Sequence, residues 1–330
     1  MSIAMIPGYI LMIVVAVIST YFSQLIEVGG KHPLEAAVIA IIIGVVLRNV
    51  KLLPETCEAG IKSFEKLLVL GIVLMGASLN FSTILSQGPK MLIIVLATMI
   101  VGFISIYLLS RMLKLSEKLS MLLAIGTTIC GGTAIAVTAP LIKAKEEETS
   151  YAIGTIALWG LVAIILYPKV AQMLGVSDFA FGVFAGTAVH STPQVVGAGF
   201  IFSELAGKTA TAVKLVRNCF LAPMAFLITI WFAKTSKTET SNIDFKKAFP
   251  WFLFGYFVMA WFHTKGFFTP EGVTAFTKAG KFLVLVGMVG VGLNTRLDAF
   301  KSVGLKPLVA GLVGSVLVAA CSIACINLLF

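Results

Sequence analysis

The amino-acid sequence predicts an all-α polytopic membrane protein with about eleven transmembrane helices, two of them discontinuous, and with internal repeats. Hydrophobic residues make up 58% of the 330 residues and charged residues only 12%, whereas about a quarter of a soluble domain is charged. Apolar stretches long enough to cross a hydrocarbon core of about 30 Å recur from end to end. Two of these stretches are interrupted in the same way, sixty residues apart.

The expected spans follow from the apolar stretches. Because no polar segment is large enough to fold separately, we expect residues 1–330 to form a single integral membrane unit, with a broken-helix core around 119–233 and scaffold helices around 8–110 and 248–329. The first stretch has no positive n-region and is interpreted as a retained helix. The spans lie near 8–26, 34–48, 66–80, 91–110, 119–142, 150–168, 178–200, 209–233, 248–264, 282–296 and 307–329.

The net charge of +10 is distributed over alternate loops, which does not indicate a nucleic-acid partner. With these spans, fifteen Lys and Arg residues fall on one side of the bilayer and eight on the other. The positive-inside rule therefore predicts that the N-terminus lies in the cytoplasm and the C-terminus outside. The five cysteines show no zinc spacing, so neither a metal site nor a disulfide framework is expected.

The two interrupted segments carry the main functional signal. Residues 126–133 read GTTICGGT and residues 186–193 read GTAVHSTP, so Gly, Thr, Ser and Pro stand where a continuous span is expected. In hydrocarbon, irregular backbone persists only where protein or a cavity satisfies its polar groups. Paired interrupted spans indicate the binding site of a transporter.

These segments supply most of the candidate site residues. The two glycines permit unusual backbone conformations, and Pro193 disfavours helix in the residue before it. Two half-helices would then end near the membrane midplane, where a helix N-terminus favours an anion. Close packing by small residues is the alternative. The candidate substrate-binding residues here are Cys130, Gly131, Gly132, Thr133, His190, Ser191, Thr192 and Gln194.

Three further side chains inside predicted spans are ionisable. His190 could bind substrate or carry a proton, or could hydrogen-bond a neighbouring helix. Lys214 and Arg217 share a helix face, and each costs about 2.5–3.5 kcal/mol near the bilayer centre, so such charges usually face a cavity or partner. Snorkelling to the interface is the alternative, mainly for Lys214. The acidic residues lie in predicted loops or at span ends, so the interior charge favours an anion.

Two further segments, residues 67–80 and 282–294, are similar to each other and end in Gly-x-x-Leu-Asn and Gly-x-Gly-Leu-Asn. We call each pair of similar segments an echo: 126–133 with 186–193 is the first, and 67–80 with 282–294 is the second. By span counting these two helices run in opposite directions, as in an inverted-topology repeat. The two echoes disagree in order, so the repeat is permuted, one broken segment is re-entrant, or one similarity is accidental. Asn80 and Asn294 are candidates for a cap or a substrate gate.

Several of these motifs carry a family resemblance. Residues 129–136 (ICGGTAIA), 139–147 (APLIKAKEE), His190 followed by residues 194–199 (QVVGAG), residues 213–217 (VKLVR) and residues 250–252 (PWF) resemble the signature of the sulfate-exporter (YeiH-like) family of conserved bacterial membrane proteins. The resemblance implies a fold related to the cation-antiporter and anion-transporter superfamily, in which a broken-helix core moves against a scaffold. Ser191, Thr192 and Pro193 depart from the pattern, since the family often has an acidic residue after the histidine.

The resulting interpretation is a secondary transporter that moves a small inorganic or sulfur-containing anion, such as sulfate, by alternating access. A sodium- or proton-coupled organic-acid transporter and an anion channel are the alternatives. The sequence contains no HExxH, P-loop or Gly-x-Ser-x-Gly motif, so we expect no enzyme and no cofactor, with H⁺ or Na⁺ as candidate coupling ions. The expected partners are a small anionic substrate and the lipid bilayer, and by analogy a second copy in a homodimer.

Overall fold

The computed structural model describes residues 3–25, 36–50, 53–78, 81–236, 252–296 and 304–330, and every regular element among them is a helix. This confirms the all-α class. Within these ranges six segments are long and apolar enough to cross a membrane, which supports a polytopic membrane protein but does not reach the expected eleven spans. They are α1 (Ile6–Leu25), Gly88–Met112 of α5 (Phe81–Met112), α8 (Glu146–Met173), Glu204–Phe232 across α11 and α12, α15 (Pro270–Leu293) and α17 (Leu305–Leu329).

The chain divides into two compact units, residues 1–86 with 251–298 and residues 87–250 with 299–330. The first unit contains α1, α2 (Ala36–Asn49), α3 (Glu58–Lys62), α4 (Phe64–Met75), α14 (Phe252–Thr264) and α15, with the short turns η1 (Ile3–Met5), η2 (Glu55–Cys57) and η3 (Gly76–Ser78). The second contains the broken helices. The helices at 88–112 and 305–329, expected in the scaffold, belong to the second unit with them.

In the first unit, α4 and α15 pack closely along most of their length. Gly290 lies against Phe64 near the start of α4, and Gly280 lies against Gly71 further along, where an added Cβ would come within 2.8 Å of a backbone carbonyl oxygen. Rising residue numbers in α4 therefore meet falling numbers in α15. The two helices are antiparallel, as the second echo predicts.

In the second unit, serines begin three of the helices that form the broken-helix region. Ser116 precedes α6 (Glu117–Thr128), Ser177 precedes α9 (Asp178–Ala188), and Ser203 precedes α11 (Glu204–Asn218). Each hydroxyl oxygen accepts a hydrogen bond from an amide in the first turn, at 3.2, 3.4 and 3.1 Å respectively. A hydroxyl N-cap satisfies an N–H group that the helix itself leaves without a partner.

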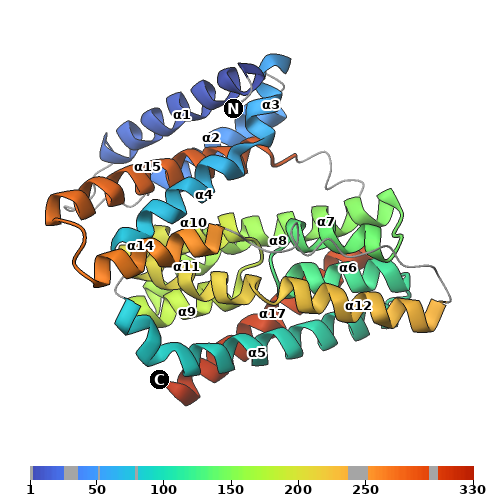
Figure 1. Ribbon diagram of the computed structural model, residues 1–330. Helices are drawn as coiled ribbons and strands as arrows, with labels where there is room; N and C mark the ends of the chain where they lie inside the picture. Colours follow the sequence, from blue (N-terminus) through green and yellow to red (C-terminus); the bar gives the residue numbers. More distant parts are fainter. Residues whose placement is uncertain (1–2, 26–35, 51–52, 79–80, 237–251, 297–303) are drawn as a thin grey trace. The chain divides into compact units, whose positions relative to one another are not determined.

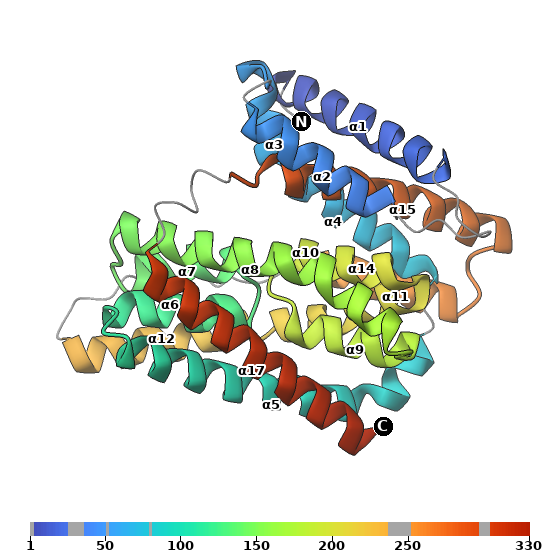
Figure 2. The same ribbon diagram turned by 180° about the vertical axis from the view of Figure 1, so that it is seen from behind.

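The first interrupted segment folds back on itself. α6 is followed by α7 (Gly132–Leu141), and the two helices pack side by side as hairpin A (α6–α7; Figures 1 and 2). Both ends lie together, because the Lys118 Nζ donates to the Lys143 carbonyl at 2.6 Å and the Ser116 hydroxyl bonds the Glu148 carboxylate. Residues 119–142 were predicted as a crossing span, and that prediction is wrong: the chain leaves this segment on the side where it entered.

The second interrupted segment behaves in the same way. α9 is followed by α10 (Thr192–Phe202) in hairpin B (α9–α10), and its two ends are joined by stacking of Phe181 on Phe202 with ring centroids 4.2 Å apart. The prediction of a crossing span at 178–200 is therefore also wrong. α8 connects the base of hairpin A to the base of hairpin B, and its 28 residues span about 42 Å.

The two hairpins consequently point toward each other from opposite ends of α8, as both views show (Figures 1 and 2). Of the alternatives left open by the sequence, re-entrance applies to both segments. Hairpins that start from opposite ends of α8 are related as an inverted repeat, although the order of the two echoes along the chain still differs.

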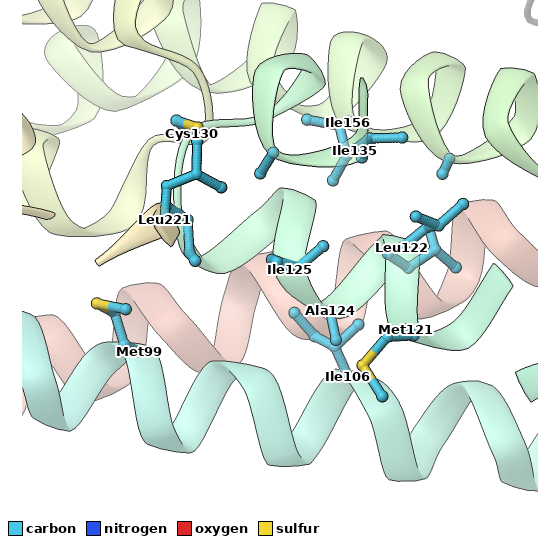
Figure 3. Close-up of a cluster of buried hydrophobic side chains, with 14 of the residues drawn as sticks. Met99, Ile106, Met121, Leu122, Ala124, Ile125, Cys130, Ile135, Ile156 and Leu221 are labelled. Carbon is cyan, nitrogen blue, oxygen red and sulfur yellow. The ribbon is translucent and has the colours of Figure 1, made fainter. Parts of the chain in front are cut away.

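The remaining helices of the second unit surround the hairpins. α5 and the apolar side chains of α6, α7 and α8 form one buried cluster, in which α6 lies between α5 and the α7–α8 layer (Figure 3). α12 (Leu221–Ser236) continues from α11 toward the base of hairpin A, where Trp231 donates to Glu117 at 3.4 Å. α17 ends near the base of hairpin B, where the Phe330 and Phe179 rings are 5.2 Å apart.

Candidate functional site

The turns of the two hairpins meet inside the second unit. We call Ile129–Gly131 tip A and Val189–Ser191 tip B. Gly131 has φ +71° and ψ −130°, a region that favours glycine, and a Cβ added there would lie 2.9 Å from Ser191 Cβ. The backbone of tip A thus lies directly against the side chain of tip B, and only glycine fits at this contact.

Lys214 of α11 binds both tips through backbone carbonyls. Its side chain is fully buried, and Nζ donates to Ile129 O of tip A at 2.7 Å and to Val189 O of tip B at 3.2 Å, with a further bond to His190 O. These three acceptors match the three N–H donors of an ammonium group. Lys214 therefore lies with the broken segments, and its donors are engaged by the protein.

Arg217, one turn further along α11, performs the same task for the last turns of α6 and α9. The residue is 1% exposed, and in the part of the chain that the structure describes its guanidinium group donates only to backbone carbonyls. The acceptors are Thr127 O and Thr128 O of α6, Gly186 O at 3.4 Å and Thr187 O at 2.8 Å of α9, and Val189 O at 3.1 Å.

These contacts have a simple electrostatic cause. The last carbonyls of a helix have no partner within the helix and carry a partial negative charge, which a nearby cation stabilises. α6 and α9 both end at the tips, so two negative helix ends lie together in the interior of this unit. Lys214 and Arg217 stabilise these two helix ends. The snorkelling interpretation of Lys214 is wrong, because its ammonium group faces the tips.

The other two half-helices begin at the tips with positive ends. α7 starts at Gly132 after Gly131, which has no side chain to cap it; Gly132 is half-buried and Thr133 is exposed. α10 starts at Thr192 after Ser191, with Pro193 in its first turn. Both half-helices therefore begin within the predicted interrupted segments.

Gln194 acts as a cap of α10. Its Oε1 accepts a hydrogen bond from the Ser191 amide at 3.2 Å, so its side chain reaches back to the residue that precedes the helix. The Gln194 Nε2 donates to Ala157 O of α8 at 3.4 Å. A Cβ at Gly160 would lie 1.9 Å from Gln194 Oε1, so this glycine makes room for the cap.

His190 is held by α17. Its Nε2 lies 2.8 Å from the Ser315 hydroxyl, which is 2.6 Å from Gly311 O. Because Ser315 has one hydroxyl proton and donates it to that carbonyl, the hydrogen-bond network assigns the imidazole proton to Nε2. Nδ1 then keeps its lone pair and is buried without a partner among the described residues. α17 also holds hairpin B through Ser322 and Thr187, whose hydroxyl oxygens are 2.7 Å apart.

Asn218 is a residue of this region that sequence reasoning missed. It is 4% exposed, and its Nδ2 donates to Thr192 Oγ1 at 3.0 Å, at the first position of α10. Its Oδ1 is buried and has no partner in the described structure. Ser315 and Ser322 were also missed. Their only signal is a polar residue in an apolar helix, which many membrane helices carry; Asn218 follows Arg217 directly, and that proximity could have drawn attention to it.

The remaining predicted residues lie in tip A, in the first unit or outside the described structure. Cys130 belongs to the apolar cluster around α6 and is drawn close to Leu221 in Figure 3. Asn294 ends α15 in the first unit and donates to Ile61 O at 3.0 Å and to Gly290 O at 2.8 Å, as a cap would. Asn80 lies outside the described residues. In the described residues, His, Cys, Asp and Glu form no cluster of three or more that could hold a metal ion.

The chain is similar to known proteins over nearly its whole length. The model of a family described as "Conserved hypothetical protein 698" matches residues 7–311. A "UPF0324 membrane protein" of Bacillus cereus is 34% identical over 308 residues, which cover 92% of this chain and 89% of that protein. Proteins of the same name in Clostridium tetani and Streptococcus pneumoniae are 34% and 32% identical, covering 96% and 92% of this chain and 94% and 91% of the relatives. The chain therefore belongs to this conserved family of bacterial membrane proteins.

Proposed function

We propose that this protein is a secondary transporter that carries a small inorganic or sulfur-containing anion, such as sulfate, across the bacterial inner membrane by alternating access. The observation that carries the proposal is the meeting of two hairpin tips around two buried cations. Lys214 and Arg217 are buried there, whereas every Asp and Glu in the described residues is exposed or only partly buried. The resemblance to the sulfate-exporter (YeiH-like) family gives the proposal its substrate class.

The charge balance at the tips favours an anion. A helix N-terminus carries roughly +0.5 and a C-terminus roughly −0.5 of an elementary charge. Because α6 and α9 end there and α7 and α10 begin there, the four helix ends cancel. With both side chains protonated, Lys214 and Arg217 leave a net positive charge in the interior, which an oxyanion would offset.

The direct ligands of the anion would be the groups that the protein itself does not use. Lys214 and Arg217 already donate to carbonyls, so they act through their charge. Free donors remain in the first amides of α7, and the hydroxyl groups of Thr133 and Ser191 lie at the helix starts. Thr192 Oγ1 accepts from Asn218, so only its hydroxyl proton would be available. The Nδ1 lone pair of His190 would suit an anion that carries a proton.

The opposed hairpins offer a route to alternating access. Hairpin A has its base at one end of α8 and hairpin B at the other, so the tips can be reached from either face depending on which hairpin yields. In the related superfamily such a core moves against a scaffold, and the first unit, with α4 and α15, is our candidate for the scaffold. A homodimer formed through that scaffold is an analogy to be tested by the mass of the purified protein.

Orientation follows from the same topology. Because hairpin A is re-entrant, the loops at 113–116 and 142–145 share a face, and Arg111, Lys114, Lys118, Lys143 and Lys145 gather there. The positive-inside rule places this face in the cytoplasm and the end of α17 outside. The outward C-terminus of the sequence prediction is kept, and the cytoplasmic N-terminus remains a prediction. Compared with the eleven-span prediction, Lys143 and Lys145 move from the outside to the cytoplasmic side, and Lys169 moves from the cytoplasmic side to the outside.

The test is uptake of radiolabelled sulfate into proteoliposomes that contain the purified protein, with unlabelled anions as competitors. The proposal expects saturable uptake that is stimulated by sulfate on the opposite side. Linear, unsaturated flux would identify an anion channel. Uptake of a carboxylate that requires an inward sodium or proton gradient, with no competition by sulfate, would identify the organic-acid transporter. The proposal assigns the protein no catalytic reaction and no cofactor.

A further inference from the structure

The carbonyl oxygens of the two tips surround the Lys214 ammonium group as they would surround a bound cation. Ile129 O comes from hairpin A, and Val189 O and His190 O come from hairpin B. None of these carbonyls lies within a continuous helix; all belong to unwound backbone at the end of a half-helix. The cluster is therefore assembled from two segments sixty residues apart, and a third segment, α11, supplies its cation.

In many secondary transporters, unwound carbonyls and the C-terminal ends of half-helices coordinate the coupling ion, often sodium. A dissociable ion at that position makes substrate binding depend on its concentration. Here the same kind of position is filled by a side chain that cannot leave. The neighbouring Arg217 takes the remaining carbonyls of α6 and α9, so the helix ends need no added ion.

We propose that Lys214 is a tethered substitute for a coupling sodium ion, so that the protein binds its anion without sodium, and that removal of this amine converts the carbonyl cluster into a site for a small monovalent cation. The first part rests on the proposed function. The second part needs only the geometry of the tips.

The residues around the carbonyl cluster determine how tightly a cation would bind there once the Lys214 amine is removed. Arg217 shares Val189 O with Lys214 and stays in place when Lys214 is replaced, so its charge opposes the incoming cation. His190 contributes a carbonyl, and its ring is held by Ser315 of α17. No described carboxylate is buried near the cluster to compensate. Sodium is therefore expected to bind weakly and to need a high concentration.

The experiment compares thermal unfolding of purified wild type, Lys214→Ala and Lys214→Met in sodium, potassium and N-methylglucamine gluconate at equal ionic strength. The methionine variant preserves most of the side-chain volume and tests whether the protein folds with an uncharged side chain at this position. Lys208→Ala is the matched control, since Lys208 lies on the same helix but pairs with Glu204 at 2.9 Å.

The proposal expects the wild type and Lys208→Ala to melt at the same temperature in sodium and in N-methylglucamine. It expects Lys214→Ala to melt lower, and sodium to restore part of that loss in a concentration-dependent way, because a ligand that binds only the folded state raises the melting temperature. Lys214→Met, whose methyl group fills the cluster, should melt lower without a sodium response.

Sodium-specific stabilisation of the wild type would overturn the proposal, even if neither Lys214 variant folds. A folded, monodisperse Lys214→Ala protein that responds equally to sodium and N-methylglucamine would overturn the second part. Gluconate is the counter-ion throughout, and no candidate substrate is present. A failure of sulfate uptake in proteoliposomes would therefore reject the proposed function without changing these melting curves.

Discussion

Gly131 of tip A lies directly against Ser191 of tip B, so that a Cβ on the glycine would come within 2.9 Å of the serine Cβ. The contact joins the ends of two hairpins that enter from opposite ends of α8. It also requires a backbone with φ +71°, which an L-amino acid rarely adopts. Both requirements make this glycine the most restricted position at the junction of the tips.

Gly131→Ala should therefore destabilise the protein by about 1–3 kcal/mol, through backbone strain and the displacement of tip B. Gly132→Ala is the control: it lies next in the chain, begins α7, and has nothing within 4 Å of an added Cβ. It should be neutral or slightly stabilising. Thermal unfolding of the two purified variants decides the point, and equal melting temperatures would contradict the close contact of the tips.

Arg217→Ala should cost more than about 3 kcal/mol, because it leaves several buried carbonyls at the ends of α6 and α9 without donors. Arg217→Lys keeps the charge but cannot reach all these carbonyls with a single ammonium group, so it should be destabilised less. Unfolding temperature and monodispersity after purification measure both effects. A stable Arg217→Ala protein would show that the guanidinium group does not hold the tips.

Ser315→Ala should destabilise by about 1–3 kcal/mol, since it leaves the buried His190 Nε2 proton without an acceptor. Ser110→Ala is a matched control on α5: the Ser110 hydroxyl is buried too, but it has no hydrogen-bond partner among the described residues. Its removal should change the unfolding temperature little. The hydrogen bond between His190 and Ser315 would be contradicted if the two alanine variants were equally stable.

The re-entrant hairpins make a topological prediction that eleven crossing spans would not make. Cysteines introduced as Lys118→Cys and Lys145→Cys should react from the cytoplasmic face, and Asp178→Cys should react from outside. Labelling of intact and permeabilised cells with a membrane-impermeant maleimide, against the parent protein, measures this. Crossing spans would reverse the sides of residues 145 and 178, so that outcome would reject the hairpins.

The positions of both breaks were predictable from the sequence because their causes are local. Gly131 supplies a backbone conformation that other residues resist, and Pro193 lies in the first turn of a helix that starts at Thr192. The direction of the chain after each break was not predictable. α6 and α7 together have about the length and hydropathy of one crossing span, and hydropathy does not record whether a chain turns back.

The partners of the buried polar groups were also beyond sequence reasoning. Lys214 and Arg217 could be identified as interior charges, but their acceptors are backbone carbonyls, which every residue has. The partner of His190 is Ser315, 125 residues away on α17. Such contacts depend on the packing of helices distant in the chain. For the same reason, Gln194 was expected to bind substrate although its side chain caps α10.

The central claim is that the tips form a positive site for an anion, and Asn218→Asp tests it most directly. Asn218 contacts Thr192 at the start of α10, so an aspartate there would place a tethered carboxylate beside the proposed site. Thermal unfolding of wild type, Asn218→Asp and Asn218→Ala would be measured with increasing sulfate and with a panel of other anions.

The account predicts that sulfate or a related oxyanion raises the melting temperature of the wild type. Asn218→Asp should melt higher than Asn218→Ala without added anion and should respond weakly to sulfate, because its own carboxylate offsets the positive charge. A wild type that responds to no anion, together with an Asn218→Asp variant that melts lower than Asn218→Ala, would contradict an anion site at the tips.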